Sequence, residues 1–139
     1  MIFCSTLVSQ ERNKERIKAY KTAYVTQELD LDSKEAEKFW PIYNEYEKMI
    51  YSIRLGKMRK EKKRIHEMGG PEAINDEDAK KTVFKMLNWE KEVVVKREQM
   101  YKELSTVLSP VKLLKLYHTE LNFNKRLLTE FKRGPGHKR

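Results

Sequence analysis

Apolar residues recur at every third or fourth position along most of the chain, and this spacing predicts amphipathic helices. The first helix is predicted over residues 11–29, where Ile17, Tyr20 and Tyr24 fall on one face. A second is predicted from Ser33 towards Glu67, with a kink at Pro41 because proline removes a backbone donor. Gly56, in the middle of this helix, is expected either to weaken it or to mark a close crossing.

The second half of the chain predicts two further helices. Met68-Gly-Gly-Pro71 is the clearest break, and the acidic run Asn75-Asp-Glu-Asp78 is typical of a helix start. Ser109 followed by Pro110 is a capping residue followed by proline at the first helical position. The pattern therefore predicts an all-α fold of four helices without strands. We expect a single helical domain over residues 10–133 and a disordered basic tail over residues 134–139.

The N-terminal segment carries no charge before Glu11, and its residues are apolar or small. We interpret residues 1–9 as the remnant of a signal peptide, with Ser9 as the small residue before the cut and the basic start missing. This interpretation makes the mature chain an exported protein and removes Cys4, the one cysteine. A frayed N-terminus is the alternative.

Composition argues against an enzyme. The chain has 139 residues, of which 37% are charged and 39% apolar, which favours long helices around a thin core. It has no Gly-rich phosphate loop, and its three histidines, His66, His118 and His137, lack partners at metal-ligand spacing. The acids alternate with lysines as on a solvated helix surface. We therefore expect no catalytic residue, no metal site and no cofactor.

Positive charge is concentrated in two stretches of a chain whose net charge is +9. One stretch runs from Leu108 to the end of the chain; the other, from Arg54 to His66, has Glu61 as its single acid. Three apolar side chains lie within the second stretch, so it offers apolar area together with long-range attraction for acidic or unfolded proteins. A solvated helix face is the alternative interpretation. The candidate client-binding residues are Arg54, Lys57, Met58, Lys60, Lys62, Arg64 and Ile65.

Two segments are weak copies of one another. They are Leu31-Asp-Ser-Lys-Glu-Ala-Glu-Lys-Phe39 and Leu108-Ser-Pro-Val-Lys-Leu-Leu-Lys-Leu116. Each has a leucine, a short capping residue and then a helical stretch, and in the first copy Asp32 and Glu35 form a predicted capping box. The motif residues are Leu31, Asp32 and Glu35 in one copy and Leu108, Ser109 and Lys112 in the other.

At these residues the chain resembles the Spy/CpxP family of envelope proteins, which carries a repeated Leu-Thr-x-x-Gln motif. It is most similar to the Bacteroidetes branch, often labelled sensors of ECF-type sigma factors, through Glu37-Lys-Phe-Trp-Pro-Ile-Tyr-Asn-Glu-Tyr-Glu47. The motif Thr is Asp32 or Ser109 here, and the motif Gln is Glu35 or Lys112. The helix caps are therefore kept, while the contact made by the Gln is in doubt.

The resemblance implies an elongated, hairpin-like helical subunit in an antiparallel, cradle-shaped dimer. It also implies an ATP-independent chaperone of the periplasm that holds unfolded envelope proteins. We expect no stable insertion into a membrane, because the apolar N-terminal segment is too short to span one. A dedicated regulator that binds one partner in an envelope-stress pathway is the first alternative. A cytosolic nucleic-acid-binding helical protein is the second, although no recognition-helix motif or stacking platform supports it.

Overall fold

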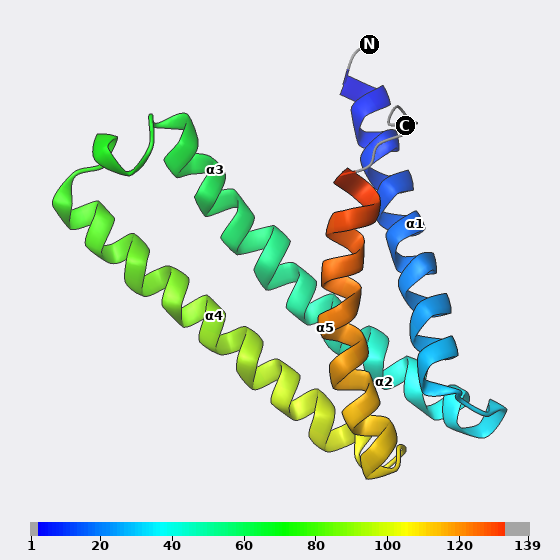
Figure 1. Cartoon of the computed structure of the whole chain (residues 1–139). Coiled ribbons are helices and arrows are strands. Elements are labelled where there is room, and N and C mark those ends of the chain that lie inside the picture. Colours follow the sequence, from blue (N-terminus) through cyan, green and yellow to red (C-terminus); the bar gives the residue numbers. More distant parts are fainter. Residues whose placement is uncertain (1–2, 133–139) are drawn as a thin grey trace. The chain divides into compact units, whose positions relative to one another are not determined.

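The computed structural model describes residues 3–132, and within that range the chain is helical and contains no strand (Figure 1). The predicted all-α class is confirmed. The elements are α1 (Phe3–Leu29), α2 (Ser33–Tyr51), the π-helix η1 (Ser52–Met58), α3 (Arg59–Glu67), the 3-10 turn η2 (Pro71–Ala73), α4 (Asp76–Leu104) and α5 (Pro110–Lys132).

The predicted boundaries hold closely, except at the N-terminus. α2, η1 and α3 follow one another without a break, so they correspond to the single helix predicted from Ser33 to Glu67. α1 begins at Phe3 instead of Glu11, so most of the segment interpreted as a signal-peptide remnant is helical. Cleavage after Ser9 stays a prediction, and the basic tail at residues 134–139 lies outside the described residues.

The chain divides into two compact units, and each is described by itself. Unit 1 contains residues 1–36 and 108–139, and unit 2 contains residues 37–107. In unit 1, α1 and α5 pack side by side and antiparallel (Figure 1). Their apolar contact includes the buried side chains of Val25, Leu29 and Leu116. Phe123 of α5 lies against the rings of Tyr20 and Tyr24, with centroids 5.7 and 5.9 Å away.

Unit 2 is a helical hairpin in which η1 packs against α4. The turn of the hairpin contains Gly69 and Gly70, whose φ angles of 111° and 98° are unfavourable for residues with a Cβ atom. Phe39 and Tyr43, from the aromatic stripe of α2, are buried, and their rings stack 5.1 Å apart. The aromatic residues of α2 therefore contribute to the core of the unit. Trp89 is half-buried against the cluster of Ile50, Ile53 and Val93.

The π-helix η1 decides which residue of the basic stretch turns towards α4. In a regular α-helix, Lys57 would follow Ile53 on the same face, four positions later. The wider turn of a π-helix instead brings the fifth residue, Met58, to that face. Met58 packs against the cluster that contains Ile53, and Lys57 is exposed. One additional residue per turn therefore keeps a charge out of the core.

Gly56 lies inside η1, but no close crossing requires it. A Cβ atom built there would meet only Ser52 Oγ, at 3.9 Å, which is an ordinary contact. We predict that Gly56→Ala raises the free energy of unfolding by about 0.5–1 kcal/mol, because alanine has less backbone freedom to lose. Urea denaturation measures the change. Destabilisation would contradict the prediction and would mean that the π turn needs glycine.

Candidate functional site

A groove of about 420 Å³ lies on unit 2 and is lined by residues of η1, α3 and α4. Its apolar part consists of one methionine and two valines, and three cations and one acid surround them. Such a surface offers both apolar contact and attraction for negative charge. The lining residues are Arg54, Met58, Lys62, Glu90, Val93, Val94 and Arg97.

The groove brings together three of the seven residues that the sequence suggested for client binding, namely Arg54, Met58 and Lys62. Lys57 and Lys60 are exposed but are not among the lining residues. The other two candidates, Arg64 and Ile65, are half-buried in α3. Lys57 and Lys60 can therefore serve as a control, because they carry the same charge on the same continuous helix but do not line the groove.

Sequence reasoning missed the contribution of α4 to this groove. Val93 and Val94 are adjacent apolar residues, but Val93 is buried and Val94 is largely exposed. Adjacent apolar residues in a helix point about 100° apart, so a Val-Val pair signals two different surfaces. Glu90 and Arg97 lie one turn before and one turn after these valines, which explains why they reach the same groove.

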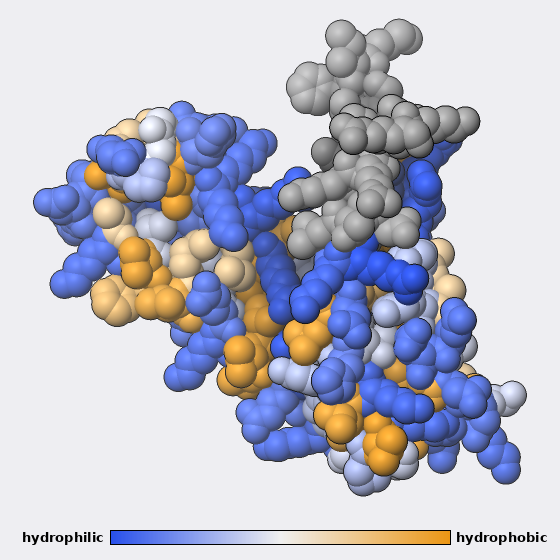
Figure 2. Space-filling model, viewed as in Figure 1, coloured by the Kyte–Doolittle hydropathy of each residue, from blue (hydrophilic) through white to orange (hydrophobic). Residues whose placement is uncertain are grey.

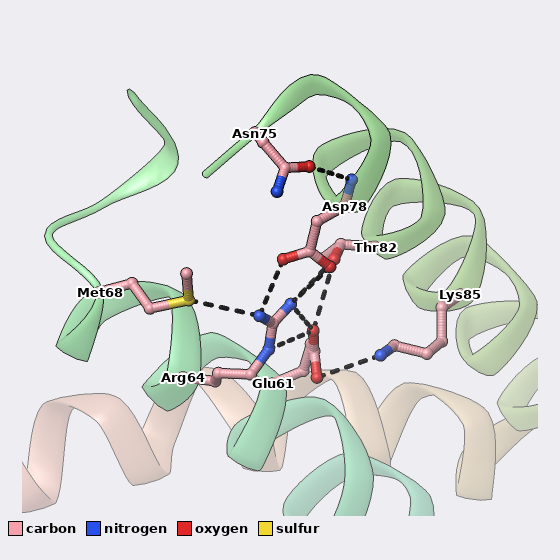
Figure 3. Close-up of polar contacts among 7 residues, drawn as sticks. All are labelled: Glu61, Arg64, Met68, Asn75, Asp78, Thr82 and Lys85. Carbon is pink, nitrogen blue, oxygen red and sulfur yellow. Dashed lines mark hydrogen bonds and ion pairs between the residues drawn. The ribbon is translucent and has the colours of Figure 1, made fainter. Parts of the chain in front are cut away.

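Arg64 belongs to a network of polar contacts between α3 and α4 (Figure 3). Its guanidinium donates to Glu61 Oε1 at 2.6 Å and to Asp78 Oδ2 at 3.0 Å, and it also donates to Thr82 Oγ1 at 3.1 Å. Lys85 Nζ lies 3.3 Å from Glu61 Oε2. Arg64 was expected among the client-binding cations, but its donors are used within the hairpin. We therefore assign it a structural role.

Glu61 and Asp78 are stabilised in their charged forms by this network. The hydrogen bond from Arg64 is the main reason that the pKa of the Glu61 carboxyl lies below its usual value, although burial opposes the shift. The same guanidinium lowers the pKa of Asp78. Groups with a lowered pKa stabilise the fold at neutral pH, and this contribution is lost as the pH falls through the lowered values.

We predict that acid destabilises wild-type protein more than the Glu61→Gln variant. At pH 7 the variant should be less stable than wild type by about 1–3 kcal/mol, because Arg64 loses a charged acceptor. Between pH 7 and pH 3 the gap should narrow, since glutamine does not titrate while Glu61 becomes protonated. Thermal melting at several pH values measures the gap. A gap that stays constant over this range would contradict the assignment.

The two motif copies meet in unit 1. Glu35 N–H donates to Asp32 Oδ1 at 2.8 Å and Asp32 N–H donates to Glu35 Oε1 at 3.3 Å, so the predicted capping box is confirmed. In the second copy, Lys112 N–H donates to Ser109 Oγ at 3.3 Å and α5 begins at Pro110. Both capping residues therefore act as the sequence indicated.

The residues that replace the motif glutamines contact each other. Lys112 Nζ lies 2.7 Å from Glu35 Oε1 and donates to the Asp30 carbonyl oxygen at 2.9 Å. Both charged side chains are about three-quarters shielded from solvent, with exposures of 26% and 21%. The hydrogen bond to Glu35 raises the pKa of Lys112. Complementary charges at the two positions thus join the start of α2 to the start of α5.

We predict that Glu35→Gln and Lys112→Gln each lower the melting temperature, because each leaves one charge facing a neutral amide. The double variant should lose clearly less than the sum of the two, because two amides can hydrogen-bond to each other as an amide pair. Thermal melting of all four proteins measures the coupling. Additive losses would show that the two positions do not interact.

The described residues contain no group of three or more His, Cys, Asp and Glu side chains arranged to hold a metal ion. Among the same residues, no helix is both long and apolar enough to cross a membrane. Comparison of the chain with protein families, with curated proteins and with solved structures finds no match. The groove and the contacts around it are therefore the basis for any functional proposal.

Proposed function

We propose that this chain is a chaperone-like protein that binds exposed segments of other proteins in the groove of unit 2, without ATP. The observation that carries the proposal is the mixed lining of that groove, in which Arg54 and Lys62 stand beside the apolar Met58. Such a surface attracts acidic segments over a distance and then retains apolar side chains by weak, local contact. Binding of this kind is reversible and needs no fixed sequence in the client.

The charge of unit 2 supports the proposal only at the groove. Over residues 37–107 the chain has 16 Lys or Arg and 13 acids, so the unit as a whole is only weakly basic, with a net charge of +3. The groove has three cations and one acid, a stronger bias than that of the unit around it. The remaining lining residues, Met58, Val93 and Val94, are apolar. We expect clients that combine exposed apolar residues with negative charge to bind first.

The cellular setting of the proposal rests on the resemblance described above. We propose that the protein acts in the periplasm on unfolded or stress-signalling envelope proteins. A dedicated regulator with one protein partner would use the same groove, but it would bind that partner in a fixed ratio. The two functions differ in client breadth, and this difference decides between them.

The experiment is suppression of aggregation of two unrelated denatured proteins, one acidic and one basic, without ATP and at two salt concentrations. Wild type should suppress both, more strongly for the acidic client, and salt should weaken the effect by screening. The variant Arg54→Glu/Lys62→Glu should lose most of the suppression. The matched variant Lys57→Glu/Lys60→Glu makes the same charge change outside the groove and should retain it.

Three results would overturn this proposal. If wild type suppresses neither client, a general chaperone function is wrong, and a regulator with a single partner takes its place. If both double variants lose suppression equally, overall charge matters and the groove does not. Binding of single-stranded nucleic acid that depends on Arg54 and Lys62 would favour a nucleic-acid-binding function. Circular dichroism of each variant verifies that the helices are intact.

A further inference from the structure

α4 has an exposed apolar side in addition to the one that it buries in unit 2. Phe84, Leu87 and Val94 are 62%, 52% and 61% exposed, although each is a large apolar side chain. They lie on a different side of the helix from the buried Val93 and Met100. Figure 2 shows apolar side chains, in orange, on the surface in the region of α4. This outward face consists of Val83, Phe84, Leu87, Val94 and Val95.

The charges within the outward face are positive. Lys80 lies seven positions before Leu87 and Lys91 four positions after it, so both lysines share its side of the helix. Both are exposed, and no ion pair among the described residues includes either of them. The nearest acid, Glu90, lies at the edge of the face, where it lines the groove. The outward face therefore combines apolar side chains with two cations that are available to a partner.

The outward face is wider than the stripe through which one helix contacts another. Val83 and Val95 lie at its two edges, about 120° apart around the helix, because each residue turns the helix by about 100°. A single neighbouring helix contacts a narrower seam, at positions a and d of a heptad. A wide apolar face with lysines on it is instead typical of a helix that lies on an extended surface.

We infer that the outward face of α4 binds the surface of a membrane that contains anionic phospholipids, with the helix lying along that surface. Such a membrane offers negative charge at the headgroups and an apolar layer directly beneath them, which is complementary to the face. Phe84 and Leu87 enter the boundary between headgroups and acyl chains. The long side chains of Lys80 and Lys91 extend back to the lipid phosphates. An acidic protein would supply the charge without the continuous apolar layer.

The inference goes beyond the proposed function and does not depend on what the groove binds. Val94 lines the groove as well as the outward face, so the test leaves it unchanged. It uses Phe84, Leu87, Lys80 and Lys91, which are exposed and are not among the groove residues. Polar or charged replacements at these four positions should therefore leave the fold of the chain intact, and circular dichroism verifies that the helices are present.

Co-sedimentation of the full chain with vesicles tests the inference. Wild type should bind vesicles of phosphatidylcholine mixed with phosphatidylglycerol at least about tenfold more tightly than vesicles of phosphatidylcholine alone, and salt should weaken this binding. The variants Phe84→Gln/Leu87→Gln and Lys80→Glu/Lys91→Glu should each weaken it at least about tenfold, because one removes apolar contact and the other reverses the charge.

Matched variants on other helices serve as controls. Val111 and Leu114 of α5 are 65% and 59% exposed, so Val111→Gln/Leu114→Gln removes similar apolar side chains elsewhere. Lys34→Glu/Lys38→Glu makes the same charge change at exposed positions of α2. Both control variants should bind the mixed vesicles as wild type does.

A wild type that binds neither kind of vesicle, or both equally, would overturn the inference. Equal losses in the outward-face variants and in their controls would also overturn it, because overall charge or apolarity would then explain the binding. If vesicles are not bound and Phe84→Gln/Leu87→Gln abolishes self-association in sedimentation equilibrium, the face belongs to a second copy of the chain instead. Each result is independent of the aggregation experiment, so the two proposals can fail separately.

Discussion

Glu61 is the single acid between Arg54 and His66, and its side chain is almost completely buried. A buried carboxylate is costly unless it is paired and hydrogen-bonded, and here Arg64 of α3 and Lys85 of α4 are its charged partners. Pairing of the two helices therefore depends on this contact. Within the basic stretch, Arg64 is therefore used inside the hairpin, whereas Arg54, Lys57, Lys60 and Lys62 are exposed.

α4 shows how a chain with 37% charged residues can form a buried core and also line an exposed groove. One face of the helix is buried against α2 and η1, the next lines the groove, and a third leaves Phe84 and Leu87 exposed. The π-helix η1 completes this arrangement, because it turns Met58 towards α4 and leaves Lys57 outside. A core this thin stabilises each unit through few side chains, so the polar contacts between helices matter more than they would in a larger domain.

Much of the fold could be predicted from the sequence because local signals agree with one another. The caps at Asp32, Asn75 and Ser109, together with the glycine pair at the hairpin turn, mark where helices begin and end, and the structure has them there. η1 could not be predicted, because a π turn keeps the apolar residues on one face only by inserting one additional residue. In the sequence, that insertion cannot be told apart from an irregularity in a 3.6-residue pattern.

The candidate site was predicted only in part, for a similar reason. Composition located the basic stretch and its apolar residues, and three of these do line the groove. Composition could not show that Arg64 is used by Glu61 and Asp78, because Asp78 comes from another helix. Nor could it show that Lys112 meets Glu35, since that contact joins residues 77 positions apart. Contacts between distant residues depend on the packing of whole helices, which a local pattern does not contain.

The most direct test of the central claim, that the groove of unit 2 binds other proteins, is hydrogen exchange of the chain with and without a denatured acidic protein. Amides of η1, α3 and the central part of α4, around Arg54, Lys62 and Val94, should exchange more slowly when the client is present. Amides of α1 and α5 in unit 1 should be unchanged. Protection confined to α1 and α5, or no protection at all, would contradict the assignment of the groove as the binding site.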